Sequence, residues 1–187
     1  MQLYLLVVGC KPDGRHTEQH DIFFGVGTSL VDLVPQLRSF WPEAHESLHI
    51  DSWRKVTCVD QYSVHIVPRS SQEYTAEPAP VKLFFINLGG YKPDDLEEYH
   101  YKLVMACTSK SEAVQRAKQS AFYLHTRFGN AVSHVDDKYG IDVDDLFEIE
   151  DILPKGIKEQ YAITLQPSPV SVADVLHIGY QKLSSLR

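Results

Sequence analysis

Residues 83–112 read LFFINLGGYKPDDLEEYHYKLVMACTSKSE, and residues 3–32 read LYLLVVGCKPDGRHTEQHDIFFGVGTSLVD. Both stretches contain, in the same order, an apolar run, a glycine, a polar segment with proline and aspartate, and a Glu-x-His pair. The offset is 80 residues, residue 83 against residue 3. We therefore predict that the chain is a tandem duplication of two similar units.

The first unit has the pattern of two strands, one helix and two further strands. Residues 3–8 and 20–26 are apolar runs bounded by glycine or polar residues, which is typical of strands. Residues 49–58 and 61–67 predict two more strands, with a turn at Val59-Asp60. Between the second strand, residues 20–26, and the third, residues 49–58, a helix is expected after the cap residue Ser29. Pro35 falls in its second turn, so we expect either a kink there or a helix that starts later.

The second unit repeats this order with a longer helix. Residues 82–88 and 99–107 predict strands joined through a turn that begins at Gly89-Gly90. A helix is expected from Ser109 to residue 127, and residues 161–167 match residues 62–68 at an offset of 99. The pair Val143-Asp144 matches Ile50-Asp51 at an offset of 93, so residues are inserted before this strand. We expect a hairpin turn at residues 154–156.

These patterns predict an α+β fold of two β-β-α-β-β units, with antiparallel sheets and helices on one face. The predicted divisions are residues 1–68 for the first unit, 69–81 for a proline-rich linker, 82–167 for the second unit and 168–187 for a terminal helix. The terminal helix is expected because apolar residues recur at helical spacing from Val172 to Leu183. Two roles remain open for this terminal helix. It covers a hydrophobic seam of the protein, or it mediates self-association.

Composition excludes several classes of partner. The formal net charge is −7 and basic residues form no cluster, so nucleic acid and anionic membrane surfaces are poor partners. No apolar run approaches the roughly 20 residues that a membrane-spanning helix needs. Residues 3–8 lack a basic leader and indicate a strand rather than a signal peptide. The three cysteines are far apart and fit a reducing cytoplasm.

One polar pattern is repeated at the entry to the second strand of each unit, namely Glu18-x-His20 and Glu98-x-His100. Residues two apart in a strand point to the same face. Three interpretations remain open. The pairs stabilise local structure, they bind a divalent metal such as zinc if both converge, or they perform acid–base chemistry. The sequence does not place His49 or Asp51 beside either pair.

The candidate ligand-binding residues are therefore Glu18, His20, Gly89, Gly90, Tyr91, Glu98 and His100, and no residue is assigned a catalytic role. We expect no resident cofactor, with a divalent metal as the alternative. Separately, a cluster of acidic residues is expected to form a solvated strand edge that discourages pairing with other strands. It comprises Asp142, Asp144, Asp145, Glu148, Glu150 and Asp151.

The order Gly89-Gly90-Tyr91, Glu98-x-His100, capped helix and Val143-Asp144-Asp145 resembles the bacterial domain-of-unknown-function family 1543. The second unit carries the pattern most fully, whereas the first has Gly9-Cys10-Lys11 in place of Gly-Gly-Tyr. The resemblance implies a cytosolic bacterial protein and supplies no activity.

The function expected from these residues is a non-enzymatic cytosolic module that binds a protein or a small ligand, with a homodimer as one expected state. The alternative is a metal-dependent or acid–base enzyme centred on the two Glu-x-His pairs. A purely structural subunit of a larger assembly is a third hypothesis.

Overall fold

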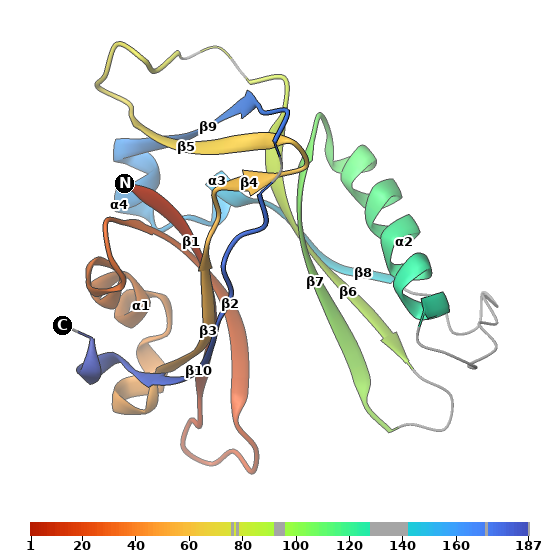
Figure 1. Cartoon of the computed structure of the whole chain (residues 1–187). Coiled ribbons are helices and arrows are strands. Elements are labelled where there is room, and N and C mark those ends of the chain that lie inside the picture. Colours follow the sequence, from red (N-terminus) through yellow and green to blue (C-terminus); the bar gives the residue numbers. More distant parts are fainter. Residues whose placement is uncertain (76, 78, 92–95, 128–141, 171, 187) are drawn as a thin grey trace. The chain divides into compact units, whose positions relative to one another are not determined.

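The computed structural model describes residues 1–187 except 76, 78, 92–95, 128–141, 171 and 187. The chain forms two compact units (Figure 1). Unit 1 comprises Met1–Pro78 and Ile152–Arg187, and unit 2 comprises Ala79–Asp151. Every strand pairing within the described residues is antiparallel, which confirms the predicted α+β class. No helix in this part of the chain is long and apolar enough to cross a membrane.

The main sheet of unit 1 has the order β10-β3-β1-β2. Short helices pack on it around a core that includes Leu6, Phe23, Leu33 and Leu37. The strands are β1 (Gln2–Cys10), β2 (Gln19–Gly27), β3 (His49–Lys55) and β10 (His177–Lys182), and the helices are η1 (Leu30–Leu33), α1 (Val34–Phe40) and η2 (Pro42–Ser47).

The α-helix of unit 1 starts several residues after the predicted cap residue Ser29. This confirms one of the two alternatives given for Pro35, namely a helix that starts later. Ser29 begins the 3-10 turn η1, and the α-helical residues start only at Val34. Pro35 therefore lies in the first turn of α1, where the amide hydrogen that proline lacks has no helical partner in any case.

A second sheet of unit 1 joins strands from both halves of the sequence. Its order is β4-β5-β9, comprising β4 (Cys58–Val59), β5 (Tyr62–Pro68) and β9 (Tyr161–Pro167). Because β9 pairs with β5, residues 152–187 belong to unit 1, although the sequence pattern grouped residues 82–167 together. The predicted hairpin at residues 154–156 is wrong. The short helices α3 (Ile149–Ile152) and α4 (Lys155–Gln160) connect β8 to β9, and β8 pairs elsewhere.

Unit 2 is a three-stranded sheet with one long helix on one face (Figure 1). Its order is β7-β6-β8, comprising β6 (Lys82–Tyr91), β7 (Glu98–Cys107) and β8 (Asp142–Glu148). Helix α2 (Lys110–Arg127) buries Ala113 and Ala117 against the sheet, which confirms the predicted helix. The turn expected at Gly89-Gly90 is wrong, because both glycines and Tyr91 are paired residues of β6.

The predicted terminal helix is also wrong. Residues 177–182 form β10, which pairs with β3, and only the short turn η3 (Leu183–Ser185) follows. Gly179 has a φ of 136°, which an α-helix does not allow. Leu183 is buried in the core of unit 1, so the tail completes this unit through a strand and one apolar anchor.

Both helical segments begin with the same carboxylate bridge, 80 residues apart. In unit 1, the backbone N–H and hydroxyl of Thr28 donate to Asp32 Oδ2 at 2.8 and 2.6 Å. In unit 2, Thr108 donates in the same way to Glu112 Oε2 at 2.8 and 2.6 Å. The hydroxyl of the threonine is the main cause that lowers the pKa of each carboxyl below its ordinary value.

These bridges should make folding sensitive to acid. A carboxyl whose folded-state pKa is lowered adds stability above its unfolded pKa and loses it as pH falls through the folded value, here below about pH 4. We expect a Glu112→Gln variant to show a smaller loss of unfolding free energy between pH 5 and 3, measured by urea denaturation at each pH. The exposed Glu73→Gln is the matched control and should keep the wild-type slope. Equal slopes in all three proteins would contradict the bridge.

Candidate metal centres

A glycine on the central strand of each main sheet marks a polar site. In unit 1, Gly9 of β1 lies between its register partners His20 on β2 and His49 on β3. In unit 2, Gly89 of β6 lies opposite His100 on β7. The same strand position thus brings a histidine of the neighbouring strand over a glycine in both units.

These glycines leave room that any other residue would fill. A Cβ at Gly9 would lie 2.7 Å from His49 Nε2 and 2.9 Å from Asp51 Oδ2. A Cβ at Gly89 would meet the carboxylate of Asp144 and would lie 2.8 Å from Glu98 Oε1. The side chains of each site therefore lean across a central strand that has no side chain of its own there.

The aspartate of each site enters through a β-bulge. In unit 1, Val7 pairs with Ser52 and Val8 with Ile50, so Asp51 is the extra residue. In unit 2 the same irregularity falls between Asn87 and Leu88, where Asp144 is the extra residue. A bulge leaves one residue unpaired and re-aims its side chain, which explains how both aspartates reach the histidine of β2 or β7.

The unit-1 site consists of Glu18, His20, His49 and Asp51. His20 Nε2 lies 3.7 Å from Glu18 Oε2 and 3.4 Å from Asp51 Oδ2. His49 Nε2 lies 2.9 Å from Glu18 Oε1 and 3.3 Å from Asp51 Oδ1. The four contacts form a closed ring of two imidazoles that alternate with two carboxylates.

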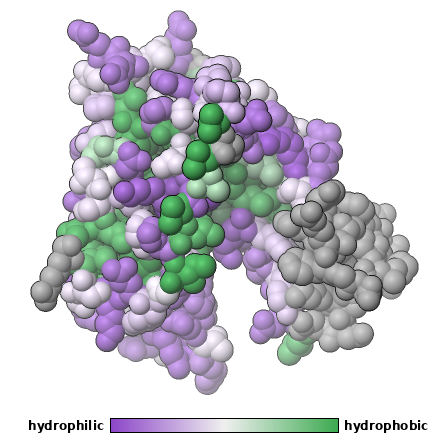
Figure 2. Space-filling model, viewed as in Figure 1, coloured by the Kyte–Doolittle hydropathy of each residue, from purple (hydrophilic) through white to green (hydrophobic). Residues whose placement is uncertain are grey.

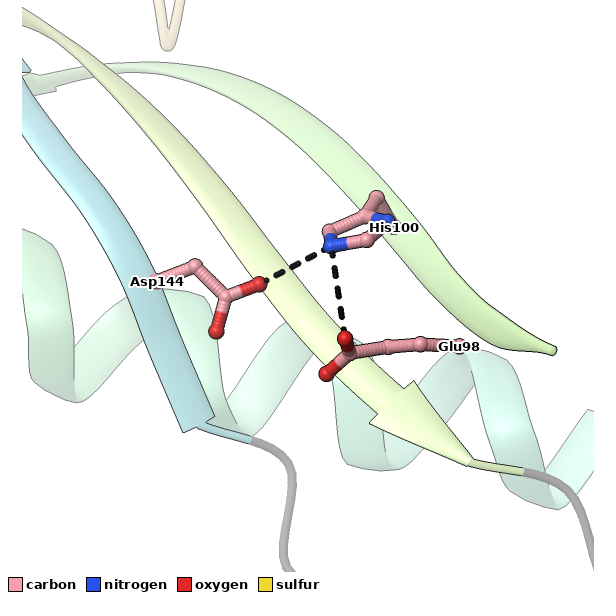
Figure 3. A group of neighbouring side chains, drawn as sticks. All are labelled: Glu98, His100 and Asp144. Atoms are coloured by element: carbon pink, nitrogen blue, oxygen red, sulfur yellow. Dashed lines mark ion pairs between the residues drawn. The ribbon is translucent and has the colours of Figure 1, made fainter. Parts of the chain in front are cut away.

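The unit-2 site consists of Glu98, His100 and Asp144, which face one another across the sheet (Figure 3). His100 Nε2 lies 3.1 Å from Asp144 Oδ2 and 3.9 Å from Glu98 Oε2. One ligand atom from each residue lies within 4.8 Å of the others, a spacing that suits a shared metal ion. Each side chain is about one third exposed, so solvent reaches this site.

The surroundings of the two sites differ. His49 is buried, with a side-chain exposure of only 5%, and the ring of Tyr180 from β10 lies against it at a centroid distance of 4.4 Å. Cys10 follows Gly9 on β1 and is also buried. Burial, with the nearby Glu18 carboxylate as the second cause, raises the pKa of the Cys10 thiol. The side chain of Cys10 belongs to the apolar core of unit 1.

The structure brings each predicted Glu-x-His pair together inside its own unit, where each pair has further partners. Gly89 also lies at its site, beneath the carboxylates. No described contact joins Gly90 to the site, and the side chain of Tyr91 lies outside the described part. Sequence reasoning missed three site residues: Asp51, Asp144 and His49. The repeated Ile50-Asp51 and Val143-Asp144 pairs were the available signal, but spacing alone does not reveal a bulge.

Comparison with known proteins relates the chain to one family model and to solved structures. Residues 15–66 match the model of a family described as a domain of unknown function, DUF1543. This match lies in the first unit, although the sequence motifs were fuller in the second. A search of curated proteins found no match. The structure is similar to the crystal structure of a protein Il1583 from Idiomarina loihiensis, with 25% identity, 97% of each chain covered and a TM-score of 0.66.

The glycine beneath the unit-2 site provides a direct test of its geometry. A Gly89→Ala substitution places a methyl group against Asp144 and Glu98, so we expect it to lower the unfolding free energy by about 1–3 kcal/mol. It should also shift the NMR signals of the His100 ring. Gly156→Ala is the matched control, because a Cβ there meets nothing within 4 Å. An unperturbed Gly89→Ala protein would show that the side chains do not lean over this strand.

Proposed function

We propose that this protein is a divalent-metal-binding module in which each unit binds one ion. The observation that carries the proposal is the group Glu98, His100 and Asp144, whose ligand atoms gather within 4.8 Å. Imidazole nitrogen and carboxylate oxygen are ordinary ligands of zinc and of similar first-row ions. A cation between these atoms offsets the repulsion between two carboxylates that converge on one point.

The occurrence of an equivalent group in unit 1 supports the proposal. His20 and Asp51 occupy the same strand and bulge positions as His100 and Asp144. Glu18, just before β2, precedes His20 by two residues, as Glu98 precedes His100. A charged group that only stabilises a loop has no need of the same bulge, the same glycine and the same three residue types in both units. The repeated arrangement therefore favours a shared ligand over a local structural role.

We further propose that residues 1–68 and 82–167, the two units predicted from the sequence, arose by tandem duplication, so that the two sites have a common origin. The pairing of Gly9 with His20 recurs as the pairing of Gly89 with His100, at the offset of 80. Strands β5 and β9 support the same relation at the offset of 99, because their antiparallel register places His65 opposite Thr164, its own equivalent.

The module is proposed to bind rather than to catalyse, in the bacterial cytoplasm. Three cysteine thiols, two of them buried, fit a reducing compartment, and the net charge of −7 disfavours nucleic acid as a partner. An enzyme is the second candidate. The observation that favours it is the partial exposure of His100, Glu98 and Asp144, because a three-residue metal site leaves coordination positions for water or substrate.

Metal content tests the proposal directly. Tag-free protein should be stripped with EDTA, titrated with zinc chloride by calorimetry and analysed for zinc by mass spectrometry. We expect the wild type to bind two ions per chain and a His100→Ala, Asp144→Asn variant to bind one. The matched control is His65→Ala, which removes a histidine outside both sites and should keep both ions. A wild-type protein that retains no zinc in this titration would refute the proposal.

Self-association is a separate part of the proposed function. The segment that leads into β10 exposes apolar side chains (Figure 2), and β10 is an outer strand of its sheet. Exposed strand edges with apolar side chains tend to pair with another chain, here a second copy. The exposed side chains are Val170, Val172, Val175, Leu176, Ile178 and Tyr180.

We expect light scattering after gel filtration to give the mass of a dimer for the wild type and that of a monomer for Ile178→Lys. The lysine places a charge in the proposed interface and leaves the pairing of β10 with β3 intact. Val31→Lys adds the same charge at an exposed position of η1 and should remain dimeric. A wild-type protein that is monomeric at every concentration would exclude this part of the proposal.

A further inference from the structure

The buried histidine of unit 1 distinguishes its site from that of unit 2. His49 Nδ1 lies 2.8 Å from the carbonyl oxygen of Ser47. A carbonyl oxygen only accepts hydrogen bonds, so Nδ1 carries a proton and donates it. In the neutral ring Nε2 then has a free lone pair, which is the arrangement of metal-binding histidines whose second nitrogen donates to a backbone carbonyl.

That lone pair faces negative charge. His49 Nε2 lies 2.9 Å from Glu18 Oε1 and 3.3 Å from Asp51 Oδ1. Despite these short distances Nε2 has no hydrogen-bond partner, and buried Asp51 Oδ2 has none either. A proton on Nε2 would therefore not point at either oxygen. The two oxygens lie to the side of that direction, where the other ligands of an ion bound to Nε2 would lie.

The nitrogen–oxygen contacts in the ring of four side chains lie close to the spacing of ligand atoms that share an ion. Ligand atoms about 2.0–2.1 Å from a shared ion lie about 2.9 Å apart at right angles and about 3.3 Å apart at the tetrahedral angle. The four nitrogen–oxygen contacts of Glu18, His20, His49 and Asp51 measure 2.9, 3.3, 3.4 and 3.7 Å. Each carboxylate turns one oxygen toward His20 and the other toward His49, so the carboxylates must rotate for all four residues to bind one ion.

Unit 2 has a different donor set. In the register with the central glycine, Asp142 takes the place of His49, since Gly89 pairs with Asp142 and Gly9 with His49. The described donors of the unit-2 site are therefore one imidazole and two carboxylates, against two of each in unit 1. Zinc favours imidazole more than magnesium, calcium or manganese do, and these ions favour oxygen donors.

We propose that the unit-1 site is a zinc-class site with four protein ligands, that His49 is one of them, and that this site fills before the site of unit 2. The inference rests on the proposed function, because it ranks two sites that must first bind metal. The preset ring of His49 and its burial under Tyr180 reduce the ordering that binding requires. The unit-2 site has a single described imidazole, which is partly exposed, and therefore exchanges its ion more readily.

Two measurements on the full chain test the inference. Zinc titration of the wild type should show a tight step and a weaker step. His49→Ala should weaken the tight step by about ten-fold or more, as the loss of a ligand does at least as much as the loss of its supporting group. His100→Ala should weaken only the other step. His65→Ala should leave both unchanged.

The second measurement separates a ligand from a merely structural residue. With one equivalent of zinc bound, the X-ray absorption spectrum should show two imidazole ligands, from His20 and His49, and one imidazole would refute the order of filling. If His49→Ala does not fold, His49→Asn retains a donor for the Ser47 carbonyl and should show one imidazole. Absence of any zinc refutes the proposed function itself. Two bound ions with a tight step insensitive to His49 substitution refute only this inference.

Discussion

The antiparallel pairing of β5 with β9 is the constraint on which the division of the chain depends. It runs through all seven residues of each strand, from Tyr62 opposite Pro167 to Pro68 opposite Tyr161. A strand that the sequence pattern assigned to the second unit thus completes a sheet of unit 1 and brings the chain back to that unit. Because the tail then starts beside β5, β10 can extend the main sheet and Leu183 can enter its core.

Each candidate site depends on a second constraint, the close approach of polar side chains to a central strand. A bulge turns an aspartate toward the histidine of the opposite neighbour, and a glycine provides the space between them. Neither device works alone, since a Cβ on the central strand would collide with the aspartate. The two sites are therefore a property of three strands together and not of the Glu-x-His pair.

Much of the local structure follows from the sequence. The first two strands of each predicted unit and the helical segment after them form where the sequence predicts, because strand alternation and helix caps are encoded within a few residues. The errors concern partners that are distant along the chain. Apolar residues from Val172 to Leu183 suit a helix, but the free edge of β3 recruits them as a strand, and Gly179 allows the required φ. Likewise, residues 161–167 form a strand as predicted, but nothing in their sequence identifies β5 as the partner.

The same limit applies to the sites. Glu98 and His100 were predicted together because both lie on one face of one strand. Asp144 was missed because a bulge changes the direction of a side chain without changing the residue spacing. His49 was missed because its role depends on burial and on the Ser47 carbonyl, which only the folded chain supplies.

The division into units has a consequence for synthesis on the ribosome. Unit 2 is a continuous segment, Ala79–Asp151, whereas unit 1 is interrupted by it. Unit 2 has all of its strands once residue 151 has emerged, but β5 has no β9 and β3 has no β10 until the last residues are made. The N-terminal part of the chain is therefore the last to be completed, which reverses the usual order in which domains fold during translation.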